Sequence, residues 1–144
     1  MDADLILPVP PEYHVLVVRT DFSDDAAFDA VCDLLALSEC EGSFVDQVHV
    51  QDRRLADADP DSIYRLCIDS GIYYLFIADA RTMTDPEHPL LVLDVDSDED
   101  RPGRTFRMVP AEVAGFDANL GISNMDFREF ADHVDPDGVF RGFR

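Results

Sequence analysis

Short apolar runs mark the expected strands of this chain. Tyr13–Val18 and Ile72–Ala78 lack polar alternation, which is typical of strands covered on both faces of a sheet. Phe44–Val50 and Leu90–Val95 are predicted as two more strands. Thr105–Val109 alternates polar and apolar residues, so we expect a half-exposed strand there, paired in a hairpin.

Between these runs, apolar residues recur every three or four positions, as on one side of a helix. Residues 28–35 carry such a stripe, and Ser23 is its expected N-cap. A second helix is expected to begin at Asp59. Two more are predicted, one from Pro110 to about Leu120 and one over Met125–Val134.

The resulting order is βαβαβ, then ββ, then αα, with an acidic turn over Asp96–Gly103. The predicted fold is α/β, with α+β character at the C-terminus. We expect a mixed, mainly parallel sheet of about five strands with helices packed on its faces and right-handed crossovers. The length of 144 residues predicts a single domain over residues 12–144, preceded by an N-terminal arm over residues 1–11.

Charge is the unusual property of the composition. The chain has 31 acidic residues against 11 arginines and no lysine, for a formal net charge of −20. Such a surface repels nucleic-acid phosphates and anionic lipids, so both partners are excluded. Three explanations stay open: the codon usage of a high-GC genome, growth in high salt, and a negative surface that attracts a basic partner.

The three cysteines and the apolar segments bear on location. The cysteines form no CxxC pair, so neither a disulfide framework nor a zinc knuckle is indicated. Residues 1–11 lack the basic segment of a signal peptide. No apolar run approaches the roughly 20 residues of a membrane-spanning helix, and we expect a soluble, cytoplasmic protein.

Carboxylates follow two of the expected parallel strands. Asp21, Asp24 and Asp25 come after the first strand, and Asp79 comes directly after Ile72–Ala78. Because the carboxyl ends of parallel strands meet at the ligand-binding edge of α/β sheets, these side chains are candidates for holding a metal ion or another ligand. The alternative is that they cap helices and stay solvated.

Two further residues are candidates at the same edge. Arg81 is expected to neutralise a neighbouring acid such as Asp79 or Asp85, with anion binding as the alternative. His88 is either held by hydrogen bonds within its loop or serves as a general base. No metal-binding spacing, phosphate loop or nucleophile motif accompanies them, so no catalytic residue, metal or cofactor is predicted.

The C-terminal part supplies candidates for binding a partner. Phe140, Arg141 and Phe143 place aromatic rings beside a guanidinium group, a composition enriched at interface hot spots. Asp126 and Asp132, in the last expected helix, are candidates for contact with a basic protein. The alternative is that the rings pack on the core and Arg141 pairs with surface acids.

Several stretches together resemble a known family. They are Val18–Asp25, Thr84–Leu91, Gly103–Arg107, Asn124–Phe127, Glu129–Asp132 and Asp137–Phe143. Over about residues 13–143, the chain is similar to small acidic actinobacterial proteins catalogued as a domain of unknown function. The resemblance implies a stand-alone cytoplasmic protein and brings no reaction, cofactor or catalytic residue with it.

The sequence therefore favours a non-enzymatic protein that binds a basic protein partner, as an immunity-type inhibitor of a toxin or as a regulator. DNA mimicry is a variant of this hypothesis. The alternative is a small ligand- or metal-binding domain, or a hydrolase, that uses the strand-end acids. A concentrated negative face beside exposed apolar residues would favour the binding protein.

Overall fold

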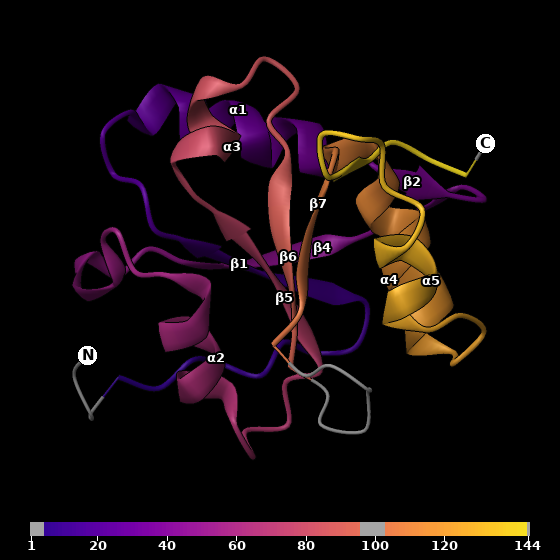
Figure 1. Ribbon diagram of the computed structural model, residues 1–144, viewed down its shortest axis with the longest axis horizontal. Helices are drawn as coiled ribbons and strands as arrows, with labels where there is room; N and C mark the ends of the chain where they lie inside the picture. Colours follow the sequence, from indigo (N-terminus) through magenta and orange to yellow (C-terminus); the bar gives the residue numbers. More distant parts are fainter. Residues whose placement is uncertain (1–4, 96–102, 144) are drawn as a thin grey trace.

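A mixed six-stranded sheet forms the centre of the part of the chain that the computed structural model describes, residues 5–95 and 103–143 (Figure 1). Its strands are β1 (His14–Arg19), β4 (Asp46–Val50), β5 (Tyr74–Ala78), β6 (Leu90–Asp94), β7 (Thr105–Met108) and β8 (Val139–Phe140). Their order is β4-β1-β5-β6-β7-β8. Three of the five pairings are parallel, which confirms the predicted α/β class and the mainly parallel sheet.

Helices cover both faces of this sheet (Figure 1). The helices of the described ranges are α1 (Asp25–Ala36), η1 (Arg53–Leu55), α2 (Pro60–Cys67), α3 (Ala80–Thr84), η2 (Pro110–Glu112), α4 (Val113–Gly121) and α5 (Phe127–Ala131). One core contains apolar side chains of α1, α3, α4 and α5. The other contains those of η1 and α2.

The two cores explain why the central strands show no polar alternation. On β1, Val15 and Val17 belong to the core beneath α1, whereas Leu16 and Val18 belong to the core beneath α2. Successive side chains of a strand point to opposite faces, so both faces must be apolar. The half-exposed strand predicted from Thr105 is also present, because Phe106 and Met108 of β7 are buried and Thr105 and Arg107 are partly exposed.

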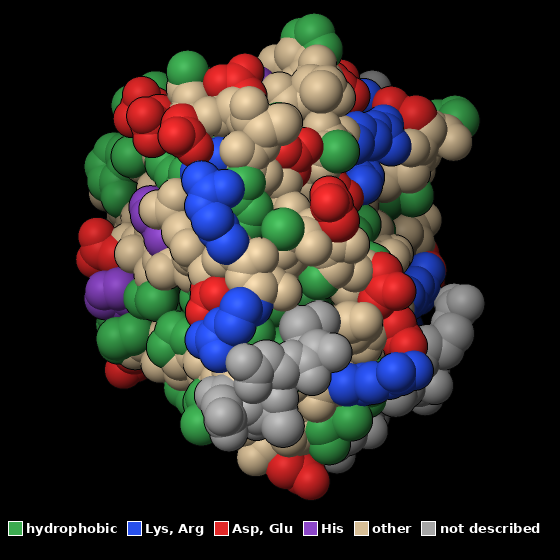
Figure 2. All heavy atoms as spheres, turned by 90° about the vertical axis from the view of Figure 1, so that its left-hand side faces the viewer, with side chains coloured by type: hydrophobic (Ala, Val, Ile, Leu, Met, Phe, Trp, Pro, Cys, Tyr) green, Lys and Arg blue, Asp and Glu red, His purple; other side chains and the backbone are tan. Residues whose placement is uncertain are grey.

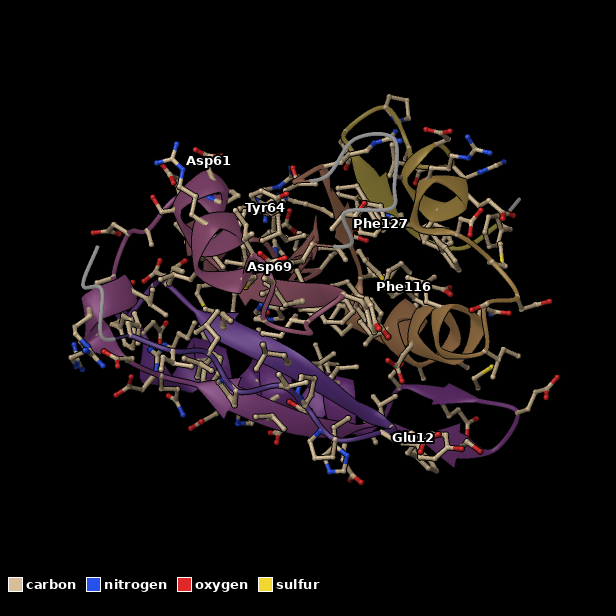
Figure 3. All side chains as sticks on the ribbon, turned by 90° about the horizontal axis from the view of Figure 1, so that it is seen from below. Glu12, Asp61, Tyr64, Asp69, Phe116 and Phe127 are labelled. Carbon is tan, nitrogen blue, oxygen red and sulfur yellow. The ribbon has the colours of Figure 1, made fainter. Side chains whose placement is uncertain are left out.

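Phenylalanines fill the core beneath α4 and α5. Phe116 is fully buried and makes edge-to-face ring contacts with Phe76, Phe106, Phe127 and Phe130. Seen from below, Phe116 and Phe127 lie on the side of α4 and α5, away from Asp61 and Tyr64 of α2 (Figure 3). Such aromatic pairs contribute about 0.5–1.5 kcal/mol each beyond the burial of their area.

Some local predictions were wrong. The N-cap of α1 is Asp24, whose carboxylate accepts a hydrogen bond from the Ala27 N–H, and not Ser23. The expected strand over residues 44–50 begins only at Asp46. Before it, β2 (Glu39–Cys40) and β3 (Ser43–Phe44) form a separate hairpin.

The hairpin and two other short elements were not expected from the sequence. Glu41 and Gly42 both have positive φ angles, which is the geometry of a two-residue type I′ hairpin turn. The short helix α3 lies between β5 and β6, where no helix was predicted, and the tail contributes β8. Elements of two to five residues carry too little periodicity to be recognised from sequence.

The N-terminal segment packs in one of the two cores. Leu5 and Leu7 are buried in the core beneath α2. The predicted acidic turn over Asp96–Gly103 lies outside the described residues except for Gly103. In the described ranges, no helix has the length and apolar character needed to cross a membrane.

Candidate functional site

The predicted cluster of carboxylates lies at the carboxyl ends of β1 and β5, but each member is already engaged. Asp21 accepts hydrogen bonds from the Ser23 hydroxyl at 2.6 Å and the Ser23 N–H at 2.8 Å. These bonds lower the pKa of Asp21, and burial and the charge of Asp79 oppose them only in part. Asp24 caps α1, and Asp25 accepts a hydrogen bond from the Arg19 guanidinium at 2.8 Å.

Arg19 is the buried cation of this edge. Its side chain is only 4% exposed and lies between the rings of Phe22 and Phe28, with the guanidinium carbon 4.8 and 4.7 Å from the two ring centres. It also donates to the side chain of Gln51 at 3.1 Å. The pairing with Asp25 and the two rings compensate for removing its charge from water.

Asp79 is engaged more closely still. Both carboxylate oxygens accept hydrogen bonds from Arg107, at 2.9 and 2.7 Å, and the same carboxylate forms a capping box with Thr82 at the start of α3. Burial raises the pKa of Asp79, but the bonds from Arg107 and Thr82 outweigh burial, so the pKa is lowered overall. The carboxylate is therefore a structural anion that holds β7 and α3 together.

The other two edge candidates also have local partners. Arg81 lies 3.7 Å from the Asp85 carboxylate and 3.9 Å from that of Asp137. His88 donates from Nδ1 to the Thr82 carbonyl oxygen at 2.8 Å. Among the described residues, no group of three or more His, Cys, Asp or Glu side chains is arranged to hold a metal ion. The geometry of this edge supports capping and ion pairing.

The C-terminal candidates are distributed between core and surface. Phe140 is 1% exposed, whereas Phe143 is 50% exposed and touches the rings of Phe130, His133 and Phe140. Asp132 pairs with Arg104 at 2.5 Å. Asp126 is the N-cap of α5, and its N–H donates to Glu129 at 3.1 Å.

Arg141 is held by three carboxylates. Its guanidinium donates to both oxygens of Glu87 at 2.8 Å, and to Asp135 and Asp137 at 2.7 Å each. The hydrogen bond from Arg141 lowers the pKa of Asp137 to about 2. These contacts fasten the residues after β8 to the loop before β6.

A different region has acids that lack such partners. Residues 20–52 contain nine Asp and Glu side chains and no arginine or lysine. Four of them, which we call the acidic face, are exposed and have no described ion pair or hydrogen bond to a cation. They are Asp29 and Asp33 on α1, and Glu39 and Glu41 on the β2–β3 hairpin.

The acids of α1 repel one another. Asp25, Asp29 and Asp33 follow at intervals of four residues on one helix, where each like-charge pair destabilises by about 0.2–0.5 kcal/mol. Their negative potential also reaches Cys32 between them, whose pKa is raised to about 11, first by burial and then by the charges of Asp29 and Asp33. The fold gains no described contact from the carboxylates of Asp29 and Asp33.

The charges near α2 differ, because acids and arginines are mixed there. Red and blue side chains lie close together on the side where α2 is found (Figure 2). Ion pairs there join Arg54 to Asp52 and Arg65 to Asp61, at 2.7 Å each. The ion pairs described elsewhere engage Arg19, Arg81, Arg104, Arg107 and Arg141, so these arginines do not neutralise the acidic face.

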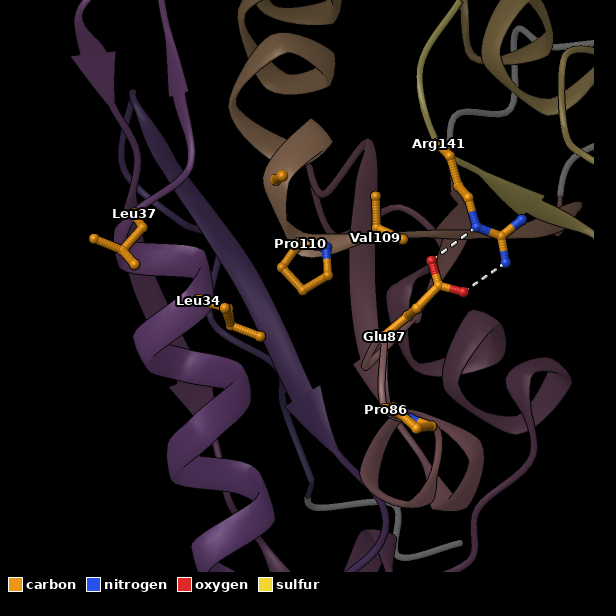
Figure 4. Close-up of a pocket in the computed structure, with 8 residues that line it drawn as sticks. Leu34, Leu37, Pro86, Glu87, Val109, Pro110 and Arg141 are labelled. Atoms are coloured by element: carbon orange, nitrogen blue, oxygen red, sulfur yellow. Dashed lines mark hydrogen bonds and ion pairs between the residues drawn. The ribbon is translucent and has the colours of Figure 1, made fainter.

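An apolar groove lies beside the C-terminal end of α1, the helix that carries Asp29 and Asp33. It has a volume of about 400 Å³ and is lined by Leu34, Leu37, Pro86, Glu87, Val109, Pro110, Ala111 and Arg141. Leu34 on α1 faces Pro110, Leu37 is the C-cap residue of the same helix, and the Glu87–Arg141 pair closes one end (Figure 4). Leu34 is 40% exposed and Leu37 is 72% exposed.

The sequence reasoning did not identify this region. The buried stripe predicted for the helix consists of Phe28, Val31, Cys32 and Leu35. Leu34 and Leu37 fall outside that stripe, and the absence of any cation between Arg19 and Arg53 was readable from the sequence. Those two signals together could have located the acidic face.

Comparison with known proteins adds a family. No curated protein matches the chain. A family model matches residues 14–143 and carries the description "Domain of unknown function (DUF6924)". Since the match spans most of the 144 residues, the chain belongs to this family of domains of unknown function.

Proposed function

We propose that this chain is a non-enzymatic interaction protein that binds a basic segment of a protein partner through the acidic face. The observation that carries the proposal is that Asp29, Asp33, Glu39 and Glu41 are exposed without a described cation, although the arginines at the strand ends are paired with acids. Lysine or arginine from a partner would supply the missing charge and accelerate association.

The repulsion along α1 supports the same proposal. A carboxylate that stabilises the fold has a partner within it, as Asp79 has in Arg107. Asp29 and Asp33 instead oppose folding slightly, and a cationic partner would convert this repulsion into attraction. Such a protein would act as an inhibitor of the immunity type or as a regulator, and as a DNA mimic if its partner binds DNA.

The three free cysteines fit a cytoplasmic location for this binding protein, because cytosolic thiols are kept reduced. The proposal does not involve the thiols. Cys32 lies on α1 beside the acidic face, and its raised pKa disfavours a reactive thiolate at neutral pH.

Affinity capture at low salt, with the tagged protein as bait in extracts of the cells that produce it, tests the proposal. We compare wild type with D29N/D33N and with a control of equal charge, D57N/D69N. Asp57 and Asp69 are exposed and have positive φ angles, which Asn tolerates well, so both variants lose two charges without strain.

The expected result is a basic protein that wild type and D57N/D69N retain, that D29N/D33N loses, and that high salt releases. Equal loss by both variants would show that net charge, and not the acidic face, is responsible. Either that result or the absence of any retained basic protein contradicts the proposal.

A further inference from the structure

We propose that the groove between α1 and residues 109–111 receives apolar side chains of an amphipathic, basic α-helix of the partner; this inference rests on the proposed function. The groove exposes Leu34 and Leu37, one helical turn apart, to solvent. Its volume of about 400 Å³ exceeds the roughly 150 Å³ cavity that holds one benzene ring. Two or three leucine-sized side chains therefore fit.

The backbone around the groove favours a helix over an extended strand. An added strand needs free N–H and C=O groups to pair with. Pro86 and Pro110 have no N–H to offer, and Leu34 and Leu37 lie at the end of a helix, where the Leu37 N–H already bonds to the Leu34 carbonyl.

Other backbone groups around the groove are also already hydrogen-bonded. The Val109 N–H donates to the Phe140 carbonyl at 3.2 Å, and the Ala111 carbonyl accepts from the Ser38 hydroxyl at 3.0 Å. A helix satisfies its own backbone and needs only side-chain contacts, which is what the groove offers.

Charge selects the occupant further. A second copy of this chain is disfavoured because each copy carries a formal net charge of −20. Asp33 directly precedes Leu34 on α1, and Glu39 follows Leu37 by two residues, so carboxylates lie close to the exposed leucines along the chain. A helix with leucines on one face and lysines or arginines beside them complements both properties at once.

Arg141 does not repel such a helix strongly, although it lines the groove. Its guanidinium is surrounded by Glu87, Asp135 and Asp137, so the charge of this end is negative overall. The Ser38 hydroxyl joins the two walls by accepting from the Ala114 N–H at 3.0 Å while it donates to Ala111. The groove is thus a fixed part of the fold.

Calorimetric titration with two synthetic peptides tests the inference. One is a lysine–alanine helix of about 16 residues with leucines at i, i+3 and i+7, and the other has alanine in place of each leucine, so its charge and helix propensity are kept. Titrations use wild type, L34Q/L37Q, D29N/D33N and D57N/D69N. Since Leu34 and Leu37 are exposed, L34Q/L37Q keeps the fold and the net charge.

We expect wild type and D57N/D69N to bind the leucine peptide at least about tenfold more tightly than the alanine peptide, because leucine side chains become buried. L34Q/L37Q should lose this preference, and D29N/D33N should weaken binding of both peptides. Retention of the preference in L34Q/L37Q, equal binding of the two peptides to wild type, or no binding of either overturns the groove assignment.

The two proposals fail in different ways. If D29N/D33N weakens the binding of both peptides but wild type shows no preference for the leucine peptide, the acidic face is supported as a binding surface and the groove is not. If wild type prefers the leucine peptide but D29N/D33N does not change the affinity for either peptide, the groove is supported as a binding site and the acidic face is not.

Discussion

The strand-end edge and the acidic face are equally rich in carboxylates but differ in what surrounds them. At the edge, Asp25 and Asp79 have arginine partners, and Asp21 and Asp24 accept hydrogen bonds from the backbone. On the acidic face, Asp29 and Asp33 have no described partner and repel each other along α1. A cluster of acids therefore indicates a binding surface only when the cations of the fold itself do not already neutralise it.

The largest effect should come from the edge. We expect D79N to lower the free energy of unfolding by about 2 kcal/mol, because Arg107, 15% exposed, keeps its charge without its partner. Asn can still cap α3, so the loss reports the ion pair. Urea denaturation measures it, and D79N/R107Q should lose less than the sum of the single variants. Strict additivity would contradict the assigned pairing.

The same substitution should change how stability depends on pH. The pKa of Asp79 lies below its ordinary value of 3.8 in the folded protein, so the unfolded chain binds its proton first as the solution is acidified. The contribution of Asp79 is therefore present above about pH 4 and is lost as the pH falls through the lowered pKa. Unfolding curves between pH 7 and about pH 2 should converge for wild type and D79N; parallel curves would refute this role.

On the acidic face, removal of a charge should have the opposite sign. We expect D29N to raise the free energy of unfolding by up to about 0.5 kcal/mol at low salt, because it removes repulsion with Asp25 and Asp33. High salt should abolish the gain. Thermal unfolding at two salt concentrations measures this, with D57N as the control. A loss of stability in D29N would mean that Asp29 has a stabilising role in the fold.

The smallest effect concerns the Cys32 thiol. Since Asp29 and Asp33 add to burial in raising its pKa to about 11, D29N/D33N should speed its alkylation at pH 8 by about twofold. Peptide mass spectrometry distinguishes Cys32 from Cys40 and Cys67. D57N/D69N should react like wild type, and an equal rate in all three proteins would show that the charges of α1 do not reach the thiol.

Much of the fold was predictable because long apolar patterns determine it. A sheet that is covered on both faces must bury apolar side chains on both. This need explains the continuous apolar runs at β1 and β5 and the apolar stripe of α1. The β2–β3 hairpin, α3 and β8 were not predicted, since they depend on turn geometry and on pairing with distant segments. Val139 and Phe140 form a strand because β7 is available beside them.

The candidate site was predictable only in part. The sequence placed Asp21 and Asp79 at one edge, as the parallel pairing of β1 and β5 requires, but Arg107, the partner of Asp79, comes from a strand 28 positions further along the chain. The groove could not be predicted from the sequence either, because its walls come from distant parts of the chain. Leu34 lies in one wall and Val109 in the other, and only folding brings these two residues together.

Ser38 has a consequence for the kinetics of binding. Its buried hydroxyl links the end of α1 to the start of α4, in place of a cap that Glu112 does not provide. The two walls of the groove are therefore positioned when the protein folds, and their conformational entropy has been lost before any encounter. A segment that binds between them meets a preorganised surface, so its rate of capture depends on diffusion and charge and not on the opening of the groove.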